Sequence, residues 1–286
     1  MAIDRAAVVG AELPQADGGW DVDDVILYHL GLGAGVPPED PGELAYVYED
    51  GLKVLPSFAV IPAMAPMWQV FSLPGMDFDL GRILHGEQVI ELLGPLPTRA
   101  SVTTTATVTG VFDKGSGALV VVELLTRDAA SGAPLFTNRN SIFVRGEGGF
   151  GGDGGPRPGP AAPDRAPDRV VRCPTLPQQA LLYRLSGDKH TLHADPAYAR
   201  RAGFERPILH GLCSYGIACK AAVDTLLDGD VAAVAGYRAR FAGPVYPGET
   251  LEVSLWDEPD RIVAGARCVE RDTVVLSHCS LDRRGR

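Results

Sequence analysis

Residues 206–227 of the chain read RPILHGLCSYGIACKAAVDTLL, the most strongly helical segment of the sequence. It predicts a helix from about residue 207 to residue 227, with apolar side chains around most of its circumference. The charged residues after its start recur every four positions, at Lys220, Asp224 and Asp228, so only a narrow stripe faces water. Because a helix that is apolar on nearly every side must be enclosed, we expect a β-sheet to wrap around it.

Segments of strand character occur in both halves of the chain, separated by glycine-, proline- and aspartate-rich turns. Alternating apolar residues bounded by such turns are typical of antiparallel strands joined by short loops. In the first of these segments Val102, Thr104, Ala106 and Val108 fall on one face. The predicted strands are 101–110, 118–127 and 135–145 in the first half, and 234–241, 250–256, 261–269 and 273–282 in the second.

The composition changes abruptly after Gly146, first to glycine and then to proline. Such a stretch cannot bury enough apolar surface to offset its ordering entropy, which is typical of a linker. We predict a first half at residues 1–145, a linker at 146–172 and a second half at 173–286. Two short helices are expected before the long one, at 176–185 and 196–202; Asp195 would cap the latter and Gly203 would end it.

The two halves also share a short sequence. Leu-His-Gly occurs at 84–86 and again at 209–211, each time upstream of a Gly-Pro pair that leads into strands. The interval is short in the first half and long enough for the enclosed helix in the second. A duplicated fold whose first copy has lost most of its central helix would explain this difference.

The overall charge excludes several kinds of partner. Lys and Arg total 26 against 36 Asp and Glu, a net charge of −10, so the chain has no basic field for nucleic acid or an anionic membrane.

No apolar run is long enough to span a bilayer, and the first residues do not resemble a secretion signal. The five cysteines are odd in number and lack paired zinc-site spacing, which suits reduced thiols and a cytoplasmic location.

The densest group of reactive side chains lies at residues 186–196, between the two short helices. Asp188 and His193 could hold one water molecule between them, so that one removes a proton while the other protonates a substrate. Other interpretations remain open at this point. Asp beside Gly also builds simple turns, and Asp188, His190 and His193 could instead ligate a metal ion, although their spacing matches no recognised zinc site.

Two further candidates adjoin the shared Leu-His-Gly sequences. Gly211 stands at the start of the enclosed helix, where backbone N–H groups lack intrahelical partners and can donate to a polarised carbonyl oxygen. It could equally serve only close packing of the helix on the sheet. Glu87 follows the first copy, where a carboxylate is more often solvated or a charge at a helix start.

Together these stretches resemble the MaoC-like enoyl-CoA hydratase 2 family. The second half carries YRLSGD at 183–188, HADP at 193–196, AGF at 202–204 and RPILHGLC at 206–213. The first half carries DVILYHLGLGA at 24–34, LPSFA at 55–59 and HGEQ at 85–88, which resemble the non-catalytic half of that family. The resemblance runs from about Trp20 to the C-terminus, except for the linker.

The resemblance implies an α+β double hot-dog fold, in which two antiparallel sheets each wrap a helix and the first helix is shortened to admit bulky acyl chains. It implies reversible hydration of trans-2-enoyl-CoA to (3R)-3-hydroxyacyl-CoA, with no metal or other cofactor, coenzyme A being part of the substrate. Asp188 and His193 match the catalytic pair, Gly211 the backbone donor that binds the thioester carbonyl, and Glu87 an acidic residue near the site. By analogy we expect a homodimer.

The chain departs from the family pattern at one catalytic position. The pattern is Asp-x-Asn-x-x-His, whereas this chain has His190 in place of the asparagine that helps to hold the water. Imidazole can also donate or accept a hydrogen bond, but it is larger and can become charged. A thioesterase, or an acyl-CoA-binding protein without catalytic activity, is therefore kept as an alternative to the hydratase.

Overall fold

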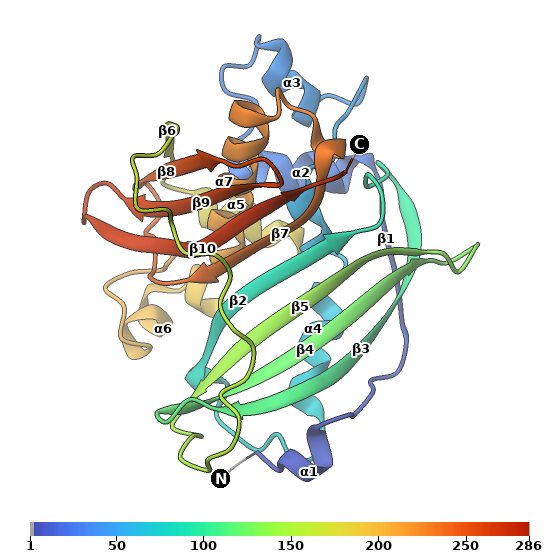
Figure 1. The fold of residues 1–286 in the computed structure, drawn as a ribbon, viewed down its shortest axis with the longest axis vertical. Coiled ribbons are helices and arrows are strands. Elements are labelled where there is room, and N and C mark those ends of the chain that lie inside the picture. Colours follow the sequence, from blue (N-terminus) through green and yellow to red (C-terminus); the bar gives the residue numbers. More distant parts are fainter. Residues whose placement is uncertain (1–2, 286) are drawn as a thin grey trace.

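The computed structural model describes residues 3–285 and contains one continuous sheet of ten antiparallel strands (Figure 1). Their order across the sheet is β1-β3-β4-β5-β2-β7-β10-β9-β8-β6. The first half supplies β1 (Ala16–Trp20), β2 (Ile83–Leu92), β3 (Ala100–Asp113), β4 (Gly117–Asp128) and β5 (Pro134–Arg145). The second half supplies β6 (Arg169–Pro174), β7 (Val234–Phe241), β8 (Thr250–Asp257), β9 (Arg261–Cys268) and β10 (Thr273–Arg283).

The two halves of the sheet meet where β2 pairs with β7. The pairing runs from Glu87 opposite Arg240 to Glu91 opposite Gly236. Each half contributes five strands, so the expected double hot-dog is confirmed, with its two sheets joined edge to edge. All seven strands predicted from the sequence are present, and β1, β2 and β6 are additional.

The enclosed helix is α7 (Gly211–Leu226), and its residues from Cys213 to Cys219 are all buried. It packs against the concave face of the second half-sheet, as Figure 1 shows from the opposite side. It begins four residues later than the sequence predicts, because the N–H of Leu209 donates to the carbonyl of Val245 at 2.7 Å in an extended segment. The wrapping of this helix by the sheet is confirmed.

The corresponding helix of the first half is short. It consists of α4 (Met64–Gln69), flanked by the 3-10 helices η1 (Pro56–Val60) and η2 (Val70–Ser72). The shortened central helix is therefore confirmed, but the argument from the repeated Leu-His-Gly sequence is wrong. Residues 84–86 lie on β2, downstream of α4, whereas residues 209–211 lead into α7, so the two copies are not equivalent in the fold.

The remaining helices cover the concave face and its rim: α1 (Arg5–Val8), α2 (Val22–Leu32), α3 (Pro41–Val47), α5 (Gln179–Tyr183) and α6 (Pro196–Arg201). The 3-10 helices η3 (Leu80–Arg82), η4 (Arg184–Ser186), η5 (Thr191–His193) and η6 (Val231–Ala233) connect them to the strands. Asp195 caps α6 by accepting from the N–H of Ala197 at 2.7 Å. Gly203, with φ of 90°, ends that helix as expected. No helix within residues 3–285 is long and apolar enough to cross a membrane.

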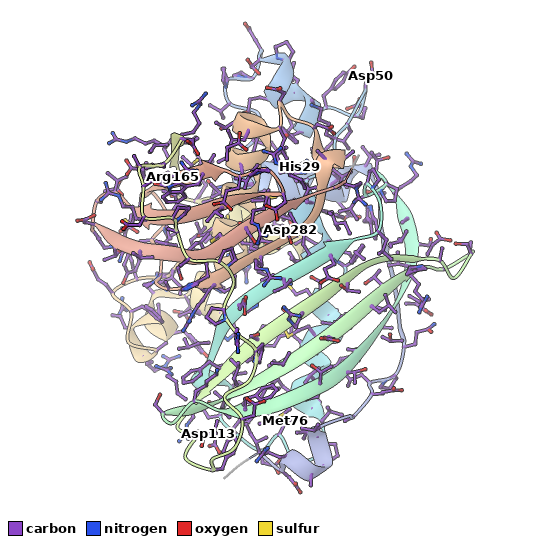
Figure 2. All side chains as sticks on the ribbon, in the orientation of Figure 1. His29, Asp50, Met76, Asp113, Arg165 and Asp282 are labelled. Carbon is purple, nitrogen blue, oxygen red and sulfur yellow. The ribbon has the colours of Figure 1, made fainter. Side chains whose placement is uncertain are left out.

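The glycine- and proline-rich segment crosses the face of the sheet opposite the helices (Figure 1). At one end the Asp113 carboxylate accepts hydrogen bonds from the N–H groups of Gly149, at 2.9 Å, and Gly151. At the other end the Trp256 indole donates to the carbonyl of Arg165 at 2.9 Å. Figure 2 labels both residues, Arg165 in the upper part of the view and Asp113 in the lower part. Strand β6 begins at Arg169, inside the range expected for the linker.

Candidate active site

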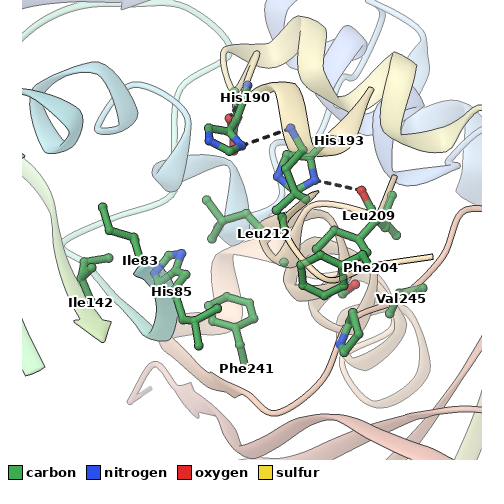
Figure 3. Close-up of a pocket in the computed structure, with 18 of the residues that line it drawn as sticks. Ile83, His85, Ile142, His190, His193, Phe204, Leu209, Leu212, Phe241 and Val245 are labelled. Carbon is green, nitrogen blue, oxygen red and sulfur yellow. Dashed lines mark hydrogen bonds between the residues drawn. The ribbon is translucent and has the colours of Figure 1, made fainter. Parts of the chain in front are cut away.

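A cavity of about 400 Å³ lies on the concave side and is built from both halves of the chain (Figure 3). Its first-half wall is mainly apolar, with His85 and Arg145 as the ionisable exceptions, and comes from α4, η2 and the sheet. Its second-half wall carries the reactive side chains, together with the start of α7. The first wall includes Met67, Trp68, Phe71, Ile83 and Ile142, and the second includes Asp188, His190, His193, Gly211 and Phe241.

Asp188 lies in the bend between α5 and α6, two residues after the end of η4. Gly187 has a φ of 131°, which an L side chain rarely adopts, and this turns the chain towards the cavity. The Asp188 carboxylate accepts a hydrogen bond from the N–H of His190 at 3.0 Å. The bend is therefore a turn stabilised by its own aspartate, as one interpretation of the sequence expected, and Asp188 also lines the cavity.

His193 enters the same cavity from the end of η5. Its Nδ1 lies 2.8 Å from the carbonyl oxygen of Ile208, which can only accept, so Nδ1 carries the hydrogen. The lone pair of the neutral ring is consequently on Nε2. Burial lowers the pKa of His193, and the Asp188 carboxylate opposes that shift. His193 is thus a neutral base near physiological pH, beside a carboxylate.

Gly211 is the first residue of α7 and lines the cavity close to these two side chains. Its N–H belongs to the first turn, where backbone donors have no intrahelical acceptor. A Cβ at this position would lie 3.1 Å from the ring of Phe241, so the glycine also serves close packing on β7. Both interpretations of Gly211 from the sequence are therefore compatible with its position.

His190 lies at the rim of the cavity and forms the N-cap of η5. Its Nδ1 accepts the N–H of Leu192 at 3.3 Å, so in the neutral ring Nε2 carries the hydrogen. The ring plane is within 1° of that of Trp68, with centroids 6.3 Å apart, and Tyr198 meets it edge-on. His190 therefore places a donor and an aromatic surface where the family motif has an amide.

Glu87 is the one candidate that does not lie at the cavity. A β-bulge interrupts the pairing of β2 with β5, so that His85 lies opposite Ile142 while Glu87 lies opposite Ser141. Neighbouring residues of a strand point to opposite faces, and Glu87 therefore faces away from the cavity. Burial raises its pKa, which the nearby Arg139, Arg238 and Arg240 counteract. The expected location of Glu87 near the site is wrong.

Sequence reasoning missed one residue of this cluster, His210. Ligand atoms of Asp188, His193 and His210 all lie within 4.8 Å of one another, and the rings of His193 and His210 stack with centroids 3.7 Å apart. In the sequence, the only sign of a role for His210 is its position next to Gly211. This trio, rather than Asp188, His190 and His193, is also the set that could be considered for a metal ion.

The stacked rings do not suit a metal ion. An ion bonds to imidazole in the plane of the ring, at about 2.1 Å from nitrogen. The two ring planes are only 25° apart and their centroids are separated by 3.7 Å, so one ion cannot lie in both planes at that distance. The arrangement therefore favours proton transfer over metal binding.

Comparisons with known proteins match both halves of the chain. Residues 19–146 match the family model of the MFE-2 hydratase 2 N-terminal domain, and residues 159–278 match that of the MaoC like domain. Enoyl-CoA hydratase ChsH3 of Mycobacterium tuberculosis is 48% identical over 96% of this chain and 97% of its own length. Peroxisomal multifunctional enzyme type 2 of Mus musculus is 40% identical over 96% of this chain, which spans 38% of that longer protein.

The structural comparison agrees. A crystal structure of a MaoC-like dehydratase from Phytophthora capsici has a TM-score of 0.88 and 30% identity, covering 99% of this chain and 98% of that one. The motifs, the joined half-sheets and these matches lead to one conclusion: the chain belongs to the MaoC-like enoyl-CoA hydratase 2 family.

Proposed function

We propose that the chain adds water across the double bond of a trans-2-enoyl-CoA thioester and releases the (3R)-3-hydroxyacyl-CoA, in a reversible reaction. The observation that supports this most directly is the meeting of Asp188 and His193 in one cavity, beside the start of α7. The family membership and the enoyl-CoA hydratase names of the relatives support the same reaction.

In the proposed reaction the pair holds one water molecule. One member removes a proton from the water as its oxygen bonds to C3, and the other delivers a proton to C2. Negative charge develops on the thioester oxygen during the addition. The N–H of Gly211 is positioned to stabilise that charge, because it is a first-turn donor of a buried helix.

The apolar wall of the first half is proposed to hold the acyl chain. Met67, Phe71, Ile83 and Ile142 line that side of the cavity with apolar side chains, and Arg145 is its charged residue. The shortened α4 leaves this space open, whereas the full-length α7 occupies the equivalent place in the second half. The acyl chain therefore has room on the side of the cavity opposite the reactive pair (Figure 3).

The first experiment compares Asp188→Asn and His193→Ala with the wild-type protein on enoyl-CoA substrates of different chain length. We expect each substitution to lower the hydration rate by roughly 10²–10⁴-fold, the usual contribution of a general acid or base. Loss of the conjugated enoyl absorbance reports the rate, and chiral analysis of the product reports its configuration. Asp50→Asn, at an exposed loop labelled in Figure 2, is the matched control and should leave the rate unchanged.

Two outcomes would contradict the proposal. Release of free CoA thiol without a hydroxyacyl product would identify a thioesterase. Binding of enoyl-CoA without any change in absorbance would identify a non-catalytic binding protein, the alternative that His190 raises.

A further inference from the structure

His210 is a buried residue at the junction of the site's elements. Its side chain is 1% exposed, and the residue is the N-cap of α7. Its Nε2 lies 3.0 Å from the backbone carbonyl oxygen of Asp188. Because a carbonyl only accepts, Nε2 is the donor and the neutral ring keeps its lone pair on Nδ1.

The same ring also packs on the second member of the reactive pair. It stacks on His193 with centroids 3.7 Å apart, and the ring of Tyr183 lies 5.0 Å away at an angle of 49°. His210 is therefore hydrogen-bonded to the bend that carries Asp188, stacked on His193, and covalently bonded to Gly211. Asp188, His193 and Gly211 reach it from separate elements and meet at this one side chain.

We propose that His210 is a positioning residue, whose hydrogen bond to the Asp188 carbonyl fixes the Asp188 carboxylate relative to the His193 ring and the Gly211 N–H. The inference rests on the proposed hydratase function. The bend itself is short and irregular, with Gly187 in a glycine-favoured conformation. Its hydrogen bond from His210, 22 residues away, joins it to the long buried helix.

The hydrogen bonding of His210 differs from that of a residue that only fills space in the core. Nδ1 of His210 is buried and has no hydrogen-bond partner among residues 3–285, which is a cost that an apolar side chain would avoid. The polar ring is thus retained in spite of one unsatisfied atom, and its other nitrogen makes the bond to the bend. Burial and the neighbouring His193 also hold the pKa of His210 well below its ordinary value, which keeps the His210 ring neutral.

The experiment distinguishes the effect of the His210 hydrogen-bond donor from the effect of its stacked ring. His210→Gln can place an amide donor near the position of Nε2, whereas His210→Phe keeps a ring that can stack but has no donor. A displacement of catalytic groups by about 1 Å can cost roughly 100-fold in rate, so we expect His210→Phe to lower kcat by about that factor. We expect KM for the enoyl-CoA to change little, and His210→Gln to recover most of the lost kcat.

Two more variants make the comparison strict. His210→Asn carries a donor that is too short to reach the Asp188 carbonyl, and it should resemble His210→Phe if the bond matters. Tyr183→Phe removes a buried hydroxyl next to the His210 ring without touching the bond, and it should retain the wild-type kcat. Thermal melting confirms that each variant is folded at the assay temperature, and the Gln and Asn pair carries the test if the Phe variant is not.

Equal kcat in the Gln and Asn variants would overturn the inference, as would a His210→Phe protein with wild-type kcat. Failure of the proposed function looks different, because the wild-type protein would then show no hydration, or Asp188→Asn would retain it in full.

Discussion

His190 occupies the asparagine position of the family motif and accepts a backbone hydrogen bond there. Its Nδ1 accepts the N–H of Leu192, as an asparagine side-chain oxygen can do at the start of a turn. The opposite ring nitrogen extends further than an amide would, next to Trp68 from the first half. The substitution therefore keeps the local turn and changes the shape of the cavity rim.

We expect His190→Asn to preserve that turn and to change the hydration rate by less than ~10-fold, or about 1.4 kcal/mol of transition-state stabilisation. His190→Leu removes the acceptor of the Leu192 N–H and should lower the free energy of unfolding by about 1 kcal/mol, as for the loss of a helix cap. Urea unfolding and the hydration assay measure the two effects. A many-fold faster His190→Asn enzyme would show instead that the native imidazole impairs the placement of water.

Sequence motifs identify some residues of the site and miss others. Asp188, His193 and Gly211 can be predicted because they lie within stretches that resemble the family's motifs, and all three line one cavity. Glu87 was misplaced because a single bulge at Gly86 reverses the face of every residue after it. The contact of His210 with a backbone carbonyl leaves no trace in any residue pattern.

Among the elements, α2 and α7 pack unusually closely, and a glycine makes this possible. A Cβ on Gly216 of α7 would lie 2.6 Å from a methyl carbon of Leu32 and 2.7 Å from the Tyr28 hydroxyl oxygen. Both neighbours are buried, and that hydroxyl donates to Ser57 at 2.9 Å. The first and second halves of the chain are therefore in direct contact here as well as at β2 and β7.

Gly216→Ala is expected to lower the free energy of unfolding by about 1–3 kcal/mol, the usual cost of overpacking a core. In a helix without such neighbours the same substitution would be stabilising, because alanine is the better helix former. Gly94→Ala is the control, since a Cβ there meets no atom within 4 Å. Chemical unfolding of both variants measures the difference, and an unchanged or more stable Gly216→Ala protein would contradict the close packing.

The elements were predicted from the sequence to different degrees. Seven strands and the enclosed helix were found because their apolar periodicity is regular and turn residues bound them. Strand β2 was missed because it reads ILHGEQVIEL, with polar residues in its middle. Gln88 is buried there and satisfied by Asn138 at 2.9 Å, which in turn donates to the carbonyl of Ala59. In the sequence alone, buried polar residues of this kind suggest a loop, because the strand that satisfies their hydrogen bonds is not known.

Over the whole molecule, several histidines are buried in the neutral form. His29 uses both ring nitrogens, because Nδ1 donates to the Tyr46 carbonyl at 2.7 Å and Nε2 accepts the Leu55 N–H at 3.3 Å. Burial lowers the pKa of His29 and that of His85 to about 4 each, and lowers the pKa of His210 as well. Protonating His29 would also remove its acceptor for the Leu55 N–H.

We therefore expect the folded state to lose stability as the pH falls below about 6.5. The unfolded chain binds protons on these histidines between roughly pH 6.5 and pH 4 while the folded chain does not, so acid favours unfolding. Each such histidine contributes up to about 1.4 kcal/mol per pH unit in that range. Urea unfolding at pH 7.5, 6 and 5 measures the slope, His29→Gln should reduce it, and a constant free energy over this interval would refute the expectation.

The pairing of β2 with β7 also marks the boundary between two functional regions of one polypeptide. On the proposed function, the room for an acyl tail comes from residues before the linker, and the proton chemistry comes from residues after it. A substitution before the linker can therefore change which acyl tails fit without altering the side chains that move protons. In a symmetric pair of identical chains, the same substitution would appear at both sites.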